Sequence, residues 1–174
     1  LFRSDADYIV ASSALSTVLD SPRDFLAHRW AYDITGGNSF SSNNFFGSYH
    51  MPMWWATVMM FRRSAEAEKI FATMNMIKRN WTHYCNLYKN TNNTYRNDHA
   101  LSIALNLING NNPNYPSIPW RMASSLPGTK IKQLDVDYYR LEYITPANLK
   151  KYILICGQDL HAMEKQQLGE IIAS

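Results

Sequence analysis

A stretch of eight residues without alternation of polar and apolar side chains constrains the fold of this chain most. It spans Trp54–Phe61, with the sequence WWATVMMF. A strand with one face in solvent alternates polar and apolar residues, whereas a strand buried on both faces does not. The stretch therefore predicts an inner strand that other elements cover on both sides.

A helix is expected directly after this strand. Ser64 is a suitable N-cap, and Glu66 and Glu68 place negative charge in the first turn, where the helix dipole favours it. Apolar residues then recur with a period of about 3.6 residues, so the helix is predicted to continue to about Lys89. We interpret this stripe as core, with a cofactor-binding surface as the alternative. The stripe comprises Ile70, Phe71, Met74, Ile77, Trp81, Tyr84 and Tyr88.

A second helix is predicted to begin at Asp98 and to end at Gly110, with apolar residues along one face. Upstream, the sequence favours a short helix over Ser13–Leu19 and one irregular strand over Phe25–Ile34. The long polar stretch Thr35–Tyr49 is either a flap near a functional site or a plain surface loop.

Short strands are expected in the C-terminal half, followed by a helix over the last dozen or so residues. The segments are Ile118–Met122, Thr129–Leu134, Tyr138–Tyr143, Tyr152–Cys156 and the helix Ala162–Ala173. These elements predict an α/β fold in which helices flank a mixed sheet. The length of 174 residues predicts a single domain over residues 1–174. Leu1-Phe2 resembles the tail of a strand already under way, so we expect an N-terminally truncated domain.

Composition argues against several classes of function. The formal charge is +3 and basic residues lie among acidic ones, so the sequence gives no direct signal of nucleic-acid binding. No apolar run is long enough to span a membrane. Cys85 and Cys156 lie far apart without metal-binding spacing, and this favours reduced thiols in a cytoplasmic protein.

Two acidic residues, Asp5 and Asp7, precede the β-favouring run Tyr8–Val10. Carboxylates on a sharp bend beside a buried strand can bind a divalent cation, one directly and the other through water. A surface turn is the alternative. A second acidic pair, Asp135 and Asp137, lies in a polar run between two short predicted strands, and we interpret it as a solvated turn.

The order of these motifs resembles that of glycosyltransferases of the GT-A type, which use nucleotide-diphosphate sugars. The resemblance is to the glycogenin and bacterial galactosyltransferase group and to phage-encoded relatives. Asp5-Ala6-Asp7 matches the DXD motif of this family. Trp54–Phe61 matches the strand motif that follows the DXD motif in this family. Arg96–Leu101 stands at the position of the third family motif, an acidic segment at the start of a helix.

The chain departs from the family pattern in two of these motifs. Trp55 and Thr57 replace an asparagine and a glycine of the strand motif. In the third motif only Asp98 is acidic. The C-terminal histidine segment of the family corresponds to Asp159–Lys165.

The resemblance implies a set of site residues at both ends of the chain. Asp5, Asp7 and His161 would hold a Mn²⁺ or Mg²⁺ ion. Lys165, together with Asp5, would lie beside the diphosphate of the nucleotide-sugar donor.

A second group, Asp98 and Asn97, would contact the sugar and carry the catalytic role. For Asp98, simple capping of the following helix is the alternative. For His161, the alternative is an ordinary surface histidine.

The resemblance therefore implies the C-terminal portion of a metal-dependent glycosyltransferase that acts on a nucleotide sugar and a glycosyl acceptor. Retention of anomeric configuration is what the family suggests. Two alternatives stay open. One is a metal-dependent nucleotidyltransferase or phosphohydrolase, and the other is a non-catalytic carbohydrate-binding or virion interaction protein on a transferase fold.

Overall fold

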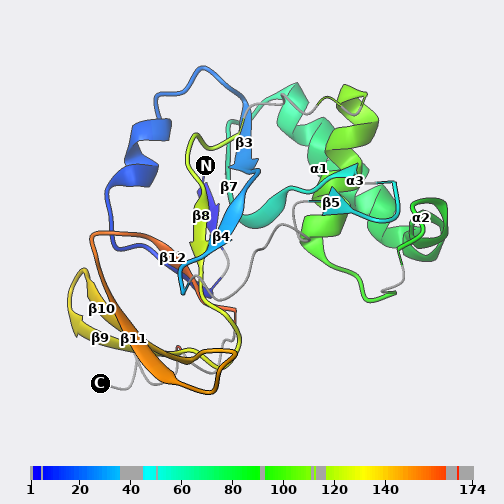
Figure 1. Cartoon of the computed structure of the whole chain (residues 1–174). Helices are drawn as coiled ribbons and strands as arrows, with labels where there is room; N and C mark the ends of the chain where they lie inside the picture. The colour runs from blue at the N-terminus through cyan, green and yellow to red at the C-terminus, as the bar shows by residue number, and fades with distance from the viewer. Residues whose placement is uncertain are drawn as a thin grey trace. The chain divides into compact units, whose positions relative to one another are not determined.

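The structure is a computed structural model of the chain (Figure 1) and describes residues 2–4, 6–35, 45–49, 51–90, 93–110, 112, 117–163 and 168. It is of mixed α/β type, with a mixed sheet and helices, as the sequence predicted. It divides into two compact units. Unit 1 comprises Leu1–Ser4, Pro22–Trp30 and Ser41–Arg121, and unit 2 comprises Asp5–Ser21, Ala31–Phe40 and Met122–Ser174.

Unit 1 is built on an antiparallel sheet in the order β1-β7-β3. Its central strand β7 (Trp55–Phe61) is buried at six of its seven positions, which confirms the inner strand predicted from the apolar run. On one side β7 pairs with β1 (Phe2–Ser4). On the other side it pairs with β3 (Phe25–His28).

Two long helices, α1 (Ala65–Arg79) and α3 (Asn97–Asn109), pack together in unit 1, and α3 also lies against β7 (Figure 1). Ser64 caps α1 as predicted, since its hydroxyl accepts a hydrogen bond from the Ala67 amide at 3.3 Å. Gly110 ends α3 in the left-handed conformation, also as predicted.

The predicted helix to Lys89 is wrong in one respect, because it breaks after Arg79. The chain resumes as α2 (Trp81–Leu87). At the break, the side-chain amide of Asn80 donates a hydrogen bond to the Met76 carbonyl at 2.9 Å. A short amide side chain that binds nearby backbone competes with helical hydrogen bonding, and the periodicity of apolar residues does not reveal this competition.

A small hairpin of unit 1, β5 (Phe45–Phe46) with β6 (Met51–Pro52), lies against the end of α2. Its turn contains Gly47 at φ +64°, and a Cβ atom at this position would lie 2.2 Å from the Tyr88 carbonyl oxygen. Glycine is required here for both its conformation and its lack of a side chain. Residues 36–44 of the predicted flap lie outside the described residues.

Unit 2 contains a four-stranded mixed sheet in the order β2-β12-β8-β4. The strands are β2 (Tyr8–Ile9), β12 (Leu160–His161), β8 (Met122–Ser124) and β4 (Ala31–Asp33). The β2 and β12 strands are antiparallel, whereas the β12–β8 and β8–β4 pairs are parallel. Strands from the two ends of the chain are therefore direct neighbours in this sheet.

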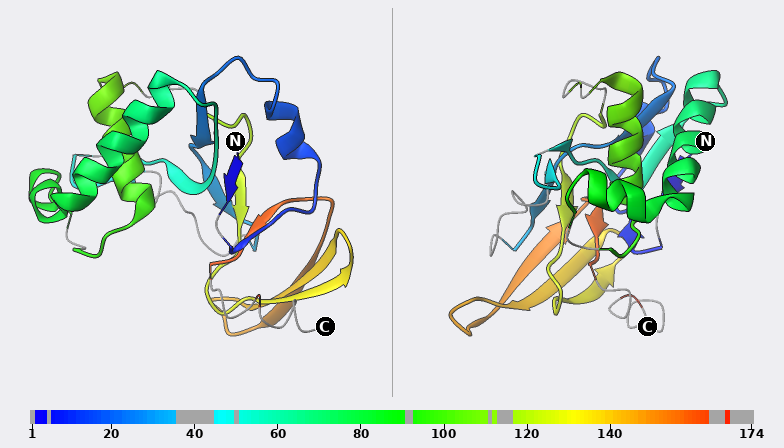
Figure 2. Two further views of the ribbon diagram at one scale, coloured as in Figure 1. Left: turned by 180° about the vertical axis from the view of Figure 1, so that it is seen from behind. Right: turned by 90° about the vertical axis from the view of Figure 1, so that its right-hand side faces the viewer.

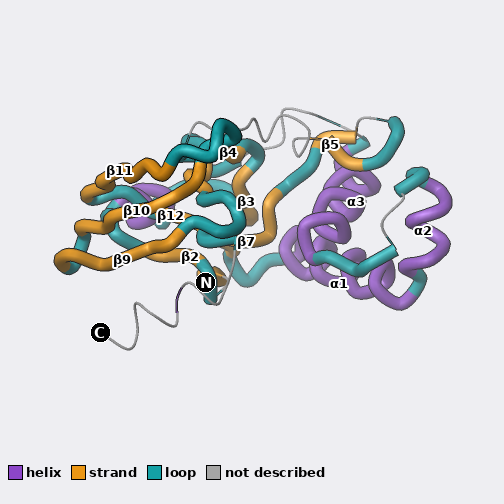
Figure 3. The backbone as a smooth tube through the Cα atoms, turned by 60° about the horizontal axis from the view of Figure 1, so that its bottom comes forward, coloured by secondary structure: helices purple, strands orange, loops and turns teal. Residues whose placement is uncertain are grey.

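The second sheet of unit 2 is an antiparallel meander, visible in Figures 2 and 3, of β9 (Lys130–Asp135), β10 (Tyr138–Ile144) and β11 (Lys150–Cys156). These strands agree closely with the predicted ones. Asp135 and Asp137 lie at the exposed turn between β9 and β10, which confirms the interpretation as a solvated turn. The core of unit 2 comprises Ala123, Ile131, Tyr139, Leu141, Ile155, Leu160 and Ala162.

Two further predictions differ from the structure, and a third, the short helix over Ser13–Leu19, is confirmed. The expected strand Phe25–Ile34 is two strands, β3 and β4, which pair in different sheets. The expected strand Ile118–Met122 is displaced, because β8 begins only at Met122. The short helix is the 3-10 helix η1 (Ala14–Val18). Each difference depends on pairing with distant strands or on turn geometry, which local patterns do not encode.

The structure also bears on two predictions made from composition. Cys85 is buried and Cys156 is exposed, and the two do not form a disulfide with each other. Among the described residues, no helix combines the length and the apolar character that crossing a bilayer would require.

Candidate functional site

The adjacent strands β2 and β12 bring Asp7 and His161 together from opposite ends of the chain. His161 of β12 is paired in register with Tyr8, the residue that follows Asp7. The Ala162 amide donates a hydrogen bond to the Asp7 carbonyl at 2.8 Å, which extends the pairing beyond the strand. The two predicted metal ligands are thus neighbours because β12 is inserted beside β2.

The spacing of the two side chains suits a bound cation. Nε2 of His161 lies 3.9 Å from Oδ1 of Asp7, which is too long for a hydrogen bond. Among the described residues, Oδ1 of Asp7 is buried and has no hydrogen-bond partner. Two ligand atoms that each lie about 2.0–2.3 Å from one ion are separated by roughly 3–4.5 Å. The donor set of one carboxylate and one imidazole therefore fits Mn²⁺ or a similar first-row cation.

Both side chains are largely buried, with exposed fractions of 12% for Asp7 and 10% for His161. A carboxylate that is mostly removed from water needs a compensating charge or hydrogen bonds. A cation between the two side chains would supply that compensation.

Ser124 of β8 contacts the other ring nitrogen of His161. Its hydroxyl oxygen lies 3.1 Å from Nδ1, and it donates a hydrogen bond to the His161 carbonyl at 3.3 Å. The neighbouring Ser125 amide donates to the same carbonyl at 2.9 Å. The ring and the backbone of His161 are therefore both held by the strand beside it.

Asp159, two residues before His161, ties the segment after Asp7 to the C-terminal strand. Its carboxylate accepts hydrogen bonds from the amides of Ala11 at 2.9 Å and Ser12 at 2.8 Å. It also accepts one from the Tyr8 hydroxyl at 3.4 Å. Burial and the negative charge of Asp159 raise the pKa of Tyr8 above its ordinary value. These bonds fix the position of β2 against β12.

Sequence reasoning did not identify Ser124 or Asp159. For Asp159 a signal exists, because it opens the segment Asp159–Lys165 on which the resemblance to the family rests. Ser124 lies far from both predicted motifs in the sequence, and only the parallel pairing of β8 with β12 reveals it.

The predicted sugar-contacting residues, Asp98 and Asn97, belong to unit 1. Asp98 lies in the first turn of α3, and its Oδ1 accepts a hydrogen bond from the Ala56 amide of β7 at 2.7 Å. Its Oδ2 is paired with Arg96 at 2.8 Å. The alternative of simple N-capping is wrong, because Arg96 occupies the cap position. Asn97 accepts a hydrogen bond from the Tyr95 hydroxyl at 3.2 Å.

A second side chain of α3 continues this anchoring of β7. Ser102, one turn after Asp98, accepts a hydrogen bond from the Trp54 amide at 2.7 Å. Amides two residues apart on a strand point to the same edge. The helix therefore satisfies two successive backbone donors at the start of β7, a structural role that the sequence did not suggest.

His99, the neighbour of Asp98, lies in an aromatic cluster of unit 1. Its ring is stacked on Trp81 with centroids 6.1 Å apart and lies 4.6 Å from the Phe46 ring. Burial lowers the pKa of His99 from 6.5 to about 4, the charge of Arg96 acts in the same direction, and Asp98 opposes them. The ring is neutral at physiological pH.

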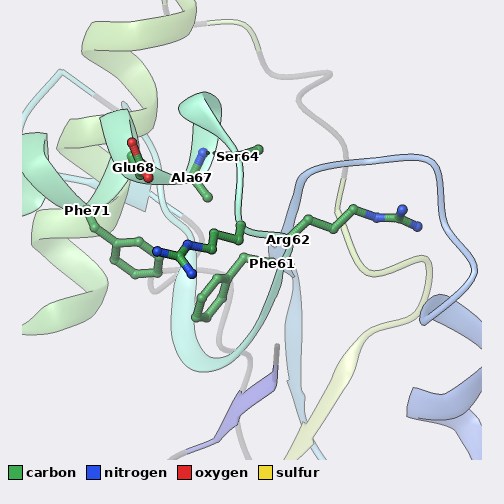
Figure 4. Close-up of a pocket in the computed structure, with 7 residues that line it drawn as sticks. Phe61, Arg62, Ser64, Ala67, Glu68 and Phe71 are labelled. Atoms are coloured by element: carbon green, nitrogen blue, oxygen red, sulfur yellow. Dashed lines mark hydrogen bonds between the residues drawn. The ribbon is translucent and has the colours of Figure 1, made fainter.

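A cavity of about 440 Å³ lies in unit 1, where β7 ends and α1 begins (Figure 4). The rings of Phe61 and Phe71 form one wall, with centroids 4.8 Å apart. Figure 4 shows the Arg62 side chain extending away from these rings. The cavity is thus mainly apolar, and none of the predicted site residues lines it.

The remaining predicted site residues, Asp5 and Lys165, lie outside the described residues. Within the described part of the chain, no group of three or more His, Cys, Asp or Glu side chains is arranged to hold a metal ion. In that part of the chain, Asp7 and His161 are the two predicted metal ligands that the structure brings together. We found no match when the chain was compared with models of known protein families, with curated proteins and with solved structures.

Proposed function

We propose that this chain is a metal-dependent glycosyltransferase that moves a sugar from a nucleotide-diphosphate sugar to an acceptor. The observation that supports the proposal most is the convergence of Asp7 and His161, with an unbonded carboxylate oxygen 3.9 Å from an imidazole nitrogen. The resemblance of the DXD motif to that of the GT-A family gives this arrangement its chemical interpretation.

Asp7 and His161 would hold Mn²⁺ or Mg²⁺ in this proposal. When bound, the ion supplies positive charge opposite the departing diphosphate. The chain's own contribution is to fix the two ligands on adjacent strands and to remove most of their surface from water, which strengthens the electrostatic interaction at the site.

The proposal also assigns roles to the remaining residues that the resemblance implies. Asp5 would be a further ligand, and Lys165 would lie beside the diphosphate. Asp98 and Asn97 would contact the donor sugar. Each Asp98 oxygen already accepts one hydrogen bond, but a carboxylate has about four acceptor sites, so sugar hydroxyl groups could still bind to it.

Metal binding is the first test. We expect Mn²⁺ to bind the wild-type chain with one site in an electron paramagnetic resonance titration. Asp7→Asn and His161→Ala should each lower that affinity by at least about tenfold, because each removes one ligand. Asp137→Asn is the matched control, since it alters the exposed second acidic pair and should leave the affinity unchanged. Equal affinity in all four proteins would contradict the proposal.

Product analysis then separates the three functional classes. Incubation with a panel of nucleotide sugars and Mn²⁺ should release the nucleoside diphosphate together with free sugar or glycoside. Release of sugar phosphate or nucleoside monophosphate would instead indicate the phosphohydrolase or nucleotidyltransferase. Metal binding without turnover would favour the non-catalytic carbohydrate-binding or interaction protein.

A further inference from the structure

We propose that Ser124 is a positioning residue of the cation site and holds the His161 ring with a lone pair of Nε2 directed towards Asp7. This inference rests on the proposed metal dependence. It begins from the register of the mixed sheet, in which Ser124 and His161 are directly paired on adjacent parallel strands. Ser124 is fully buried, and its hydroxyl contacts both the ring and the backbone of His161.

The hydrogen bonds that the Ser124 hydroxyl can form determine which nitrogen of the neutral His161 ring carries the proton. A serine hydroxyl donates one hydrogen bond and can accept two. The Ser124 hydroxyl donates to the His161 carbonyl at 3.3 Å, so its oxygen is free to accept from Nδ1–H at 3.1 Å. Both contacts are then hydrogen bonds. If the Ser124 hydroxyl donated its single hydrogen to Nδ1 instead, it would have no hydrogen left for a bond to the His161 carbonyl.

A ring protonated at Nδ1 carries a lone pair on Nε2. Nε2 lies 3.9 Å from Oδ1 of Asp7, so two acceptor atoms then lie close to one another. Two neighbouring acceptors repel one another when no donor or cation lies between them, whereas both can bind a cation placed between them. Histidine ligands of metal ions usually have the second ring nitrogen held by a hydrogen bond, and loss of that partner weakens metal binding by about 10–100-fold.

The adjacent Ser125 provides a matched control. It is also fully buried, and its hydroxyl accepts a hydrogen bond from the Met163 amide at 3.4 Å. It contacts His161 only through its backbone amide, which a substitution by alanine retains. Ser124→Ala and Ser125→Ala therefore each remove one buried hydroxyl, but only the first removes a partner of the His161 ring.

The first measurement is Mn²⁺ affinity by electron paramagnetic resonance on the 174-residue chain. Ser124→Ala should bind Mn²⁺ about 10–100-fold more weakly than the wild type, and Ser125→Ala should bind it as the wild type does. Equal affinity of Ser124→Ala and the wild type would overturn the role of Ser124 and leave the proposed function intact. Failure of the wild type itself to bind Mn²⁺ would contradict the proposed function.

The second measurement needs no metal and no variant. Nitrogen-15 NMR of the metal-free wild type, under conditions where the His161 ring is neutral, should show the proton on Nδ1. A proton on Nε2 would overturn the inference even if Ser124→Ala does not fold. In a folded Ser124→Ala protein the Nδ1 preference should disappear, whereas Ser125→Ala should retain it.

Discussion

His99 is a basic side chain that the fold keeps neutral, and this makes stability depend on pH. Its pKa falls from 6.5 in the unfolded chain to about 4 in the folded one. Between these values the unfolded chain binds a proton that the folded chain does not, so stability decreases as the pH falls through this window. The loss reaches about 3 kcal/mol by pH 4.

His99→Phe should remove this pH dependence, because phenylalanine can stack on Trp81 and Phe46 but does not titrate. Urea unfolding, followed by tryptophan fluorescence at several pH values between 7 and 4, measures the effect. The stability of the wild type should fall relative to that of the variant as the pH falls. If the difference in unfolding free energy between the wild type and His99→Phe stays constant from pH 7 to pH 4, the pKa of His99 is not lowered in the folded protein.

At the scale of single residues, the sequence predicted some contacts and missed others for physical reasons. The resemblance led us to expect Asp7 and His161 side by side, and the structure agrees. Ser124 and Asp159 were missed, because serine and aspartate are common in turns and on surfaces. Their importance arises only from the neighbours that the sheet supplies.

At the scale of elements, the hairpin β5–β6 depends on one glycine. Gly47 and Gly110 have the same φ of +64°. An added Cβ at Gly110 would meet nothing within 4 Å, whereas at Gly47 it would lie 2.2 Å from the Tyr88 carbonyl oxygen. Gly110→Ala should therefore cost only the conformational strain of about 1–2 kcal/mol.

Gly47→Ala should cost clearly more than Gly110→Ala, because the hairpin has to move away from the end of α2. Urea unfolding of the two variants measures the difference. Hydrogen exchange should also show faster opening of the Phe46 amide in Gly47→Ala only. Equal losses of unfolding free energy in the two variants would contradict this prediction, because the hairpin would then move away from α2 without an energetic cost.

The predictable elements are those whose signals are local. The inner strand β7, the start of α1 and the end of α3 follow from an apolar run, the Ser64 cap and the C-terminal glycine Gly110. The break at Asn80 was missed, since the apolar stripe continues across it. The separation of β3 from β4 was also missed, because it depends on which distant strands are available to pair with each one.

At the scale of the whole molecule, neither unit is one continuous segment. The chain passes between them after Ser4, Ser21, Trp30, Phe40 and Arg121. Residues 41–121 contain β7 and the helices α1, α2 and α3 but neither of the described strands that pair with β7. A fragment of residues 41–121 should therefore lack cooperative unfolding, because both edges of a buried strand lose their hydrogen-bond partners.

A fragment of residues 22–121 is the matched comparison, since it regains β3 on one edge of β7. We expect a cooperative urea transition for this fragment, measured by circular dichroism. If residues 41–121 alone unfold as cooperatively as residues 22–121, the helices are sufficient and the strand pairing is not required.

The position of β12 inside its sheet has a consequence for protein synthesis. A ribosome releases β2, β4 and β8 well before β12, yet β12 lies between β2 and β8. Until residue 161 has left the exit tunnel, β2 lacks the strand partner that the described residues give it, and its edge is open to pairing with other nascent chains. A translational pause before this point would prolong that exposure, so a chaperone that covers strand edges would help this chain most before residue 161 emerges.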